Sequence, residues 1–157
     1  MEQNVFCASS ARGIAQRVHY ENFYFRYSRV RDMWFFVSMF ISNLFIPLIM
    51  LVGGYFMCKK PPKEINSVIG YRTKMSKKNI DTWEFAHDYC GRLWLKLGIA
   101  LFIPTAIVQI PFVHSSDNVI GNMTLIVEIV QLVVLIGSIV PVEKALKRTF
   151  DENGVRR

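Results

Sequence analysis

Residues 33–58 read MWFFVSMFISNLFIPLIMLVGGYFMC, a run of 26 residues without a charge. A helix of about 20 residues crosses the roughly 30 Å hydrocarbon core of a bilayer, so this run is long enough to span a membrane. Two further apolar blocks follow: residues 93–113, with Lys96 near the start, and residues 119–142, with Glu128 inside. A chain of 157 residues has too little polar sequence to cover three such blocks in a soluble fold. The sequence therefore predicts an all-α membrane protein with three transmembrane helices.

The positive charges predict how these spans are oriented. Residues 59–92 hold eight Lys and Arg residues and residues 144–157 hold five, whereas the connection 114–118 holds none. Lys and Arg accumulate in cytoplasmic loops. We therefore predict a multi-pass membrane protein with loop 59–92 and the C-terminus in the cytoplasm and loop 114–118 outside. The same rule accounts for the net charge of +7 better than nucleic-acid binding does. Membrane lipid is thus an expected partner, and no direct contact with nucleic acid is expected.

The first 32 residues fit this orientation badly. Three spans with the C-terminus inside place the N-terminus outside, yet residues 1–32 carry five arginines beside the first span. We therefore predict that residues 1–32 are an N-terminal extension, non-native or unstructured, without a function. Residues 33–148 would form the three-span membrane domain and residues 149–157 a basic cytoplasmic tail. The alternative for the extension is an amphipathic arm on the membrane surface.

Polar side chains inside the spans are costly in hydrocarbon, so each of them needs a partner. Such residues recur at helical spacing on all three predicted spans, and Glu128 carries the one acidic group among them. If these stripes face one another, they form an intramembrane polar cluster of Asn43, Thr105, Glu128 and Gln131. The cluster is either hydrogen-bonded packing between helices or a site for a proton or ligand.

The first loop is predicted to contain a helix of its own. Two consecutive prolines after residue 60 end the first span, because proline lacks the N–H donor and clashes with the preceding turn. Ser76 or Asn79 can cap a new helix, in which apolar residues recur every three or four positions over residues 80–97. We predict an amphipathic cytoplasmic helix that lies on the membrane surface, anchored by Trp83 and Trp94.

Between the prolines and the cap, the loop shows no helical period. Gly70 to Thr73 combine a turn, an aromatic ring, the forked cation of Arg72 and a hydroxyl, which together suit an anionic group. The alternative is that Arg72 binds a lipid phosphate or caps a helix end. The candidate partner- or anion-binding residues of the loop are Asn66, Gly70, Tyr71, Arg72, Thr73, Ser76, Asn79 and Trp83.

The other patterns argue against catalysis. Glu84 and His87 have the spacing of half a di-iron site, but only one copy occurs, and we predict a solvated pair. The three cysteines show no CxxC spacing, so neither a disulfide frame nor a zinc site is predicted. No nucleophile elbow, Walker loop or HExxH motif occurs. We expect no enzyme activity, no cofactor and no metal.

The loop also carries a particular order of residue types between the first and second spans: Pro61, Pro62, Asn66, Gly70, Tyr71, Arg72, Thr73, Ser76, Asn79, Trp83, Ala86 and Gly91. This order resembles the SdpI-like bacterial membrane family. The resemblance covers about residues 33–148, where the spans match only in number and placement. Nothing in residues 1–32 matches, and Glu128 is not among the shared positions.

The resemblance implies an immunity-type membrane protein. The best-known member of that family protects a Bacillus cell against its own secreted killing peptide, and it is also described as a signal receptor that holds a transcriptional repressor at the membrane. A peptide toxin and a cytoplasmic repressor are thus the implied partners. Two alternatives stay open. One is a small transporter or channel subunit that uses Glu128, which requires a homo-oligomer because three helices are too thin to enclose a pore. The other is a membrane scaffold without a ligand.

Overall fold

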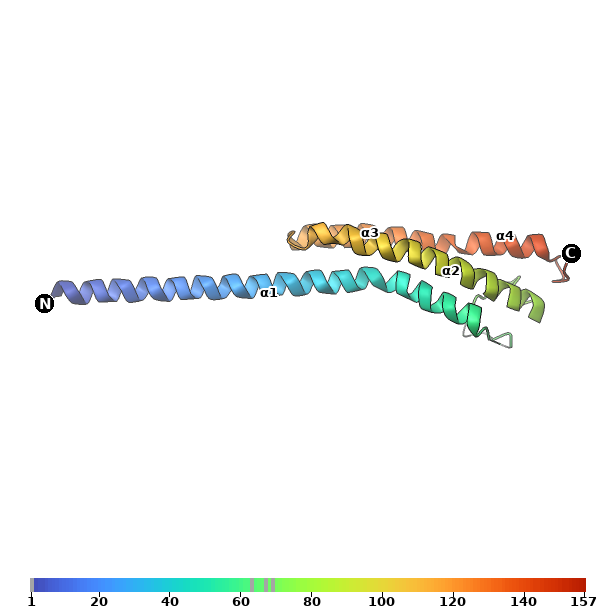
Figure 1. Ribbon diagram of the computed structural model, residues 1–157, viewed down its shortest axis with the longest axis horizontal. Helices are drawn as coiled ribbons and strands as arrows, with labels where there is room; N and C mark the ends of the chain where they lie inside the picture. The colour runs from blue at the N-terminus through green and yellow to red at the C-terminus, as the bar shows by residue number, and fades with distance from the viewer. Residues whose placement is uncertain (1, 63, 67, 69) are drawn as a thin grey trace.

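The computed structural model describes the backbone of residues 2–62, 64–66, 68 and 70–157, and the side chains of residues 21, 26 and those from 30 onward within these ranges. Four α-helices and one short 3-10 helix follow one another along the chain: α1 (Glu2–Lys59), α2 (Ile80–Gln109), η1 (Ile110–Phe112), α3 (Asp117–Gly137) and α4 (Ile139–Thr149). Figure 1 shows α2 and the nearly collinear α3 and α4 alongside the C-terminal half of α1, whose N-terminal half projects beyond them.

Three helical stretches are long and apolar enough to cross a membrane: Val30–Lys59, Ile80–Phe112 and Asp117–Thr149. The prediction of an all-α protein with three membrane helices is therefore confirmed. The third span consists of α3 and α4, which are separated at Ser138. Pro141 lacks the N–H that would continue the helical hydrogen bonds across this point, and the Ser138 hydroxyl donates to the carbonyl of Leu135 at 2.6 Å.

Small residues let α1 and α2 approach backbone to backbone. A Cβ atom added at Gly54 would lie 2.9 Å from the carbonyl oxygen of Gly91, and one added at Gly91 would lie 2.8 Å from that of Gly54. Further along the pair, a Cβ at Gly98 would lie 2.8 Å from Cγ of Leu51. Glycine and other small residues are the usual means by which membrane helices pack closely without a hydrophobic driving force between them.

The structure does not show the separate amphipathic helix expected on the membrane surface. Residues 80–92 are instead the first turns of the continuous helix α2. Their apolar stripe faces protein: Trp83 and Ala86 are fully buried, and Ala86 belongs to a core with Tyr71, Leu146 and Phe150. Trp83 is therefore not an anchor in the lipid interface.

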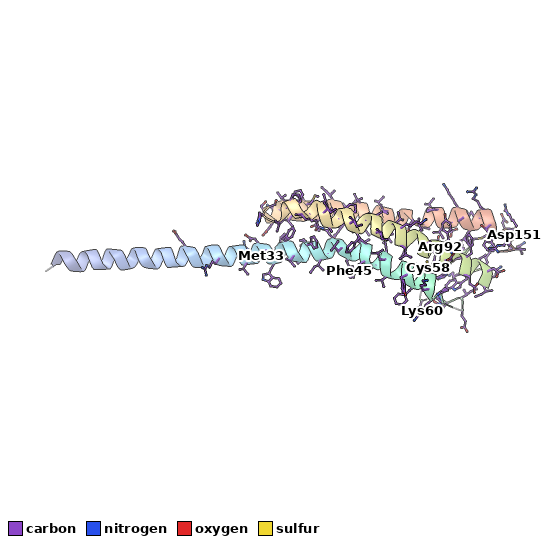
Figure 2. All side chains as sticks on the ribbon, in the orientation of Figure 1. Met33, Phe45, Cys58, Lys60, Arg92 and Asp151 are labelled. Atoms are coloured by element: carbon purple, nitrogen blue, oxygen red, sulfur yellow. The ribbon has the colours of Figure 1, made fainter. Side chains whose placement is uncertain are left out.

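The basic segments lie at one end of the bundle. Figure 2 shows Lys60, Arg92 and Asp151 together at the end opposite Met33, and the Asn79 side chain donates to the carbonyl of Gly154 at 2.6 Å. The loop and the tail therefore lie at the same end of the bundle. The backbone of α1 is helical from Glu2, and the division of the chain at residues 32 and 148 stays a prediction.

The orientation can be tested with introduced cysteines at two exposed positions. We expect Ser116→Cys to react with a membrane-impermeant thiol reagent on intact cells and Lys74→Cys to react only after lysis, because the Lys- and Arg-rich side is predicted to be cytoplasmic. The unchanged chain, with its natural cysteines, gives the background. Labelling of Lys74→Cys on intact cells would reverse the assignment.

Candidate functional site

Tyr71 joins the first loop to two helices. Its backbone N–H donates to Nε2 of His87 on α2 at 3.1 Å. Its hydroxyl donates to a carboxylate oxygen of Glu143 at 3.2 Å and lies 3.3 Å from the carbonyl of Ile139, both on α4. Burial, followed by the adjacent Glu143 carboxylate, raises the pKa of Tyr71, so the hydroxyl keeps its proton and remains a donor. The loop is thereby fixed against α2 and α4 at once.

His87 is a buried member of this junction, so the prediction that it forms a solvated pair with Glu84 is wrong. The imidazole is fully buried, whereas Glu84 is exposed. Nε2 accepts from Tyr71, which leaves the proton on Nδ1, 2.7 Å from the carbonyl of Trp83. The indole of Trp83 in turn donates to the carbonyl of Pro62 at 2.9 Å. Trp83 and His87 therefore bind the loop at its start and near its middle.

Thr73 and Ser76 form a turn that holds itself together. The backbone N–H of Thr73 donates to the Ser76 hydroxyl at 2.8 Å, and the N–H of Ser76 donates to the Thr73 hydroxyl at 3.2 Å. Ser76 also donates to the carbonyl of Tyr71 at 3.0 Å and is fully buried. Local bonds of this kind favour turns over helix, which explains the break before α2.

Of the two predicted caps, Asn79 is the one that α2 uses. Its side-chain oxygen accepts from the N–H of Thr82 at 2.8 Å, and its own N–H donates to the Thr82 hydroxyl at 3.1 Å. These two bonds form a capping box. Because Asn79 also bonds to Gly154, the same residue starts the helix and holds the C-terminal tail.

Arg72 is the predicted loop residue whose side chain faces outward. It is exposed between two buried anchors, Tyr71 and, after the turn, Ser76. The side-chain oxygen of Asn66 accepts from the N–H of Val68 at 3.0 Å. The bonds above join Tyr71, Thr73, Ser76, Asn79 and Trp83 of the predicted set to one another or to α2, with Arg72 exposed beside them.

Hydrogen bonds between the spans join Asn43, Thr105 and Gln131 of the predicted intramembrane cluster, and Gln109 and Thr124 belong to the same group. The Asn43 amide on α1 donates to Oε1 of Gln109 at 2.7 Å and to the hydroxyl of Thr124 at 3.2 Å. The Gln131 amide donates to the hydroxyl of Thr105 at 2.9 Å and to the backbone carbonyl of Asn43 at 3.0 Å. All five residues are buried. The polar cluster, as named below, consists of Asn43, Thr105, Gln109, Thr124 and Gln131.

Glu128 lies beside the polar cluster, on the flank between α1 and α3. Its half-buried carboxylate accepts from the hydroxyl of Ser42, an exposed residue, at 2.8 Å. Ser42 precedes Asn43, and neighbouring residues of a helix point about 100° apart. That angle explains why the carboxylate meets the serine and not the asparagine.

A comparison with models of protein families identifies the family of this chain. A family model described as "SdpI/YfhL protein family" matches residues 63–142, just over half of the chain. The chain belongs to this family. The match contains the Tyr71–His87 junction and the α2 and α3 sides of the polar cluster, but not α1 with Asn43.

A curated relative supports the assignment over a shorter stretch. It is described as "Uncharacterized protein YfhL" from Bacillus subtilis (strain 168), and it is 36% identical over 53 residues, which are 34% of this chain and 48% of that protein. The match thus spans about half the length of the relative. No solved structure matches the chain. The chain is therefore a multi-pass membrane protein of the SdpI/YfhL type, a family not known as enzymatic.

The Tyr71–His87 junction requires glycine at position 70. Gly70 has φ +105°, and a Cβ there would meet Nε2 of His87. A left-handed backbone costs a residue with a Cβ about 1–2 kcal/mol, so we expect Gly70→Ala to raise trypsin cleavage within the loop roughly tenfold. Gly137→Ala is the matched control, because nothing lies within 4 Å of its added Cβ. Equal cleavage of the two variants would contradict this role for Gly70.

The polar cluster should contribute measurably to stability. Gln131→Met removes two hydrogen bonds between helices, each worth about 0.6 kcal/mol on average in membrane proteins. We expect the melting temperature of the protein in detergent, followed by tryptophan fluorescence, to fall by about 2–6 °C. Leu132→Met changes the neighbouring exposed side chain and should leave it unchanged. An unaltered melting temperature in Gln131→Met would show that the cluster adds no stability.

Proposed function

We propose that the chain is an immunity-type membrane protein that protects a bacterium against a secreted killing peptide. The observation that carries the proposal is membership of the SdpI/YfhL family over residues 63–142. The matched region holds Tyr71 and His87 and the α2 and α3 residues of the polar cluster, whereas the relative is described as an uncharacterized protein. The protective role therefore rests on the resemblance of this region to the SdpI-like type.

In this proposal the membrane spans have one role and the first loop and the tail have another. The apolar outer faces of the three spans meet a membrane-active peptide within the bilayer, where exposed side chains such as Phe45, Ile107 and Val133 lie. The loop and tail, proposed to be cytoplasmic, report to a regulator inside the cell. Signalling is thus a second step, separate from neutralisation of the peptide.

Arg72 is the residue proposed to recognise the regulator or another anionic group. A guanidinium offers a planar fork of donors that matches a carboxylate or phosphate, and lysine does not reproduce it. Tyr71 and Ser76 hold the backbone on either side of Arg72 through the bonds described above, so the fork starts from a fixed base. A fixed base lowers the conformational entropy lost on binding.

The protective role can be tested in a sensitive bacterial host that lacks its own immunity protein. The full chain is expressed, and the cells are challenged with culture supernatant from a strain that secretes a killing peptide. We expect survival at supernatant dilutions that kill cells with the empty vector. Equal killing of both, with the protein present in the membrane, would exclude protection against that peptide.

The role of Arg72 is tested by a matched pair of Arg→Lys variants. Loss of one charge-assisted hydrogen bond costs about 1.5 kcal/mol, so Arg72→Lys should weaken regulator-dependent reporter output about tenfold at unchanged membrane abundance. Arg92→Lys makes the same substitution at an exposed ion pair with Asp88, which contributes little, and should have no effect. If both variants behave like the unchanged chain, Arg72 is not the recognition group.

A further inference from the structure

In the polar cluster, the side-chain amides of Asn43 and Gln131 each donate both of their hydrogens. A side-chain amide carries two N–H donors and one carbonyl oxygen. Asn43 donates to Gln109 and Thr124, and Gln131 donates to Thr105 and to the backbone carbonyl of Asn43. Neither amide therefore has a donor left for any further group.

The two carbonyl oxygens of these amides are buried without a partner. Asn43 Oδ1 and Gln131 Oε1 are the atoms concerned, and each residue is 1% exposed. Most buried polar atoms in proteins are hydrogen-bonded, and a buried unpaired acceptor is destabilising. The cluster thus has an excess of electron-rich oxygens between three helices.

Reversing the amides does not remove this excess. A flipped Gln131 would set its oxygen against the backbone carbonyl of Asn43, acceptor against acceptor. A flipped Asn43 would meet Oε1 of Gln109, whose orientation is fixed by donation from its Nε2 to the carbonyl of Thr105 at 2.8 Å. The surplus of acceptors is therefore a property of the side chains present and not of how the amides are oriented.

The carboxyl group of Glu128 lies beside the polar cluster. Glu128 is one helical turn before Gln131 and bonds to Ser42, which precedes Asn43. Neither of the ion pairs Arg31–Asp32 and Arg92–Asp88 includes Glu128. A carboxylate in the hydrocarbon region is expensive unless a positive group compensates it.

We propose that the polar cluster and Glu128 bind one monovalent metal cation, sodium or potassium. Carbonyl, hydroxyl and carboxylate oxygens are the donors that hard cations prefer. Asn43 Oδ1 and Gln131 Oε1 supply carbonyl ligands, the threonines supply hydroxyl oxygens, and Glu128 balances the charge from the adjacent turn. A single carboxylate matches a charge of +1, whereas a divalent ion would leave net positive charge within the membrane.

The proposed site departs from the expectation of no metal, which rested on His, Cys and paired carboxylate side chains. The described residues contain no group of three His, Cys, Asp or Glu side chains that could hold a metal. The proposed ligands are mainly amide and hydroxyl oxygens instead. The proposal is independent of the immunity role, since it concerns the purified protein without any peptide.

The test measures the melting temperature of the full chain in detergent at constant ionic strength. Sodium chloride and potassium chloride are compared with N-methylglucamine chloride, whose cation is too large for the site. We expect one of the two metal ions to raise the melting temperature in a saturable way, by about 5–10 °C at a hundred times its Kd. Equal melting temperatures in all three salts would overturn the proposal.

Two variants and one further salt separate binding from general salt effects. Glu128→Gln keeps the size of the side chain and its bond to Ser42, and we expect it to abolish the response to the metal ion. Glu152→Gln removes an exposed carboxylate of the tail and should leave the response intact. An undiminished response in Glu128→Gln would overturn the proposal. If that variant does not fold, magnesium chloride on the unchanged chain decides: an equal rise with magnesium would show a non-specific effect of salt and contradict the site.

Discussion

Inside a bilayer, a polar side chain finds partners only among other protein groups, and Asn43 shows how this constraint sets the packing of the three spans. Its amide reaches Gln109 on α2 and Thr124 on α3, while its backbone carbonyl accepts from Gln131. A shift of α1 by one residue would break all three bonds and leave their partners unpaired in hydrocarbon. Each bond is weak on its own, but together they select one register out of several that apolar packing alone would tolerate.

That register has consequences at the end of the bundle that carries the first loop. α1 and α2 are in close contact at Gly54 and Gly91, so the loop of residues 60–79 leaves α1 close to α2 and returns to it. Trp83 meets Pro62 at the start of the loop, and His87 meets Tyr71 near its middle. The loop is therefore ordered by the helices it connects. The backbone beside its exposed residue Arg72 is held by the bonds of Tyr71 and Ser76.

Hydropathy was sufficient to predict the three spans, because length and lack of charge are properties of the sequence itself. It could not decide which surface the stripe on residues 80–92 would cover, since lipid and protein both select apolar residues at the same period. For that reason Trp83 was expected at the membrane surface and His87 in solvent, whereas both are buried in the protein. The polar cluster was predicted in outline from helical spacing. The placement of Glu128 beside it depends on the rotation of α1, which spacing on a single helix cannot define.

The two polar sites are connected through the third span. Gln131 in the polar cluster lies two turns before Ser138, where α3 ends, and the Ser138 hydroxyl accepts from the indole of Trp94 at 2.9 Å. The next residue, Ile139, offers its carbonyl to the Tyr71 hydroxyl. A rotation or shift of α3 caused by binding at the cluster would therefore act on a break in the helix whose far side is bonded to the loop. Coupling between sites requires an element that can take two arrangements. The junction of α3 and α4 at Ser138 is a candidate for that element, because Ile139 directly after it bonds to Tyr71, which precedes Arg72.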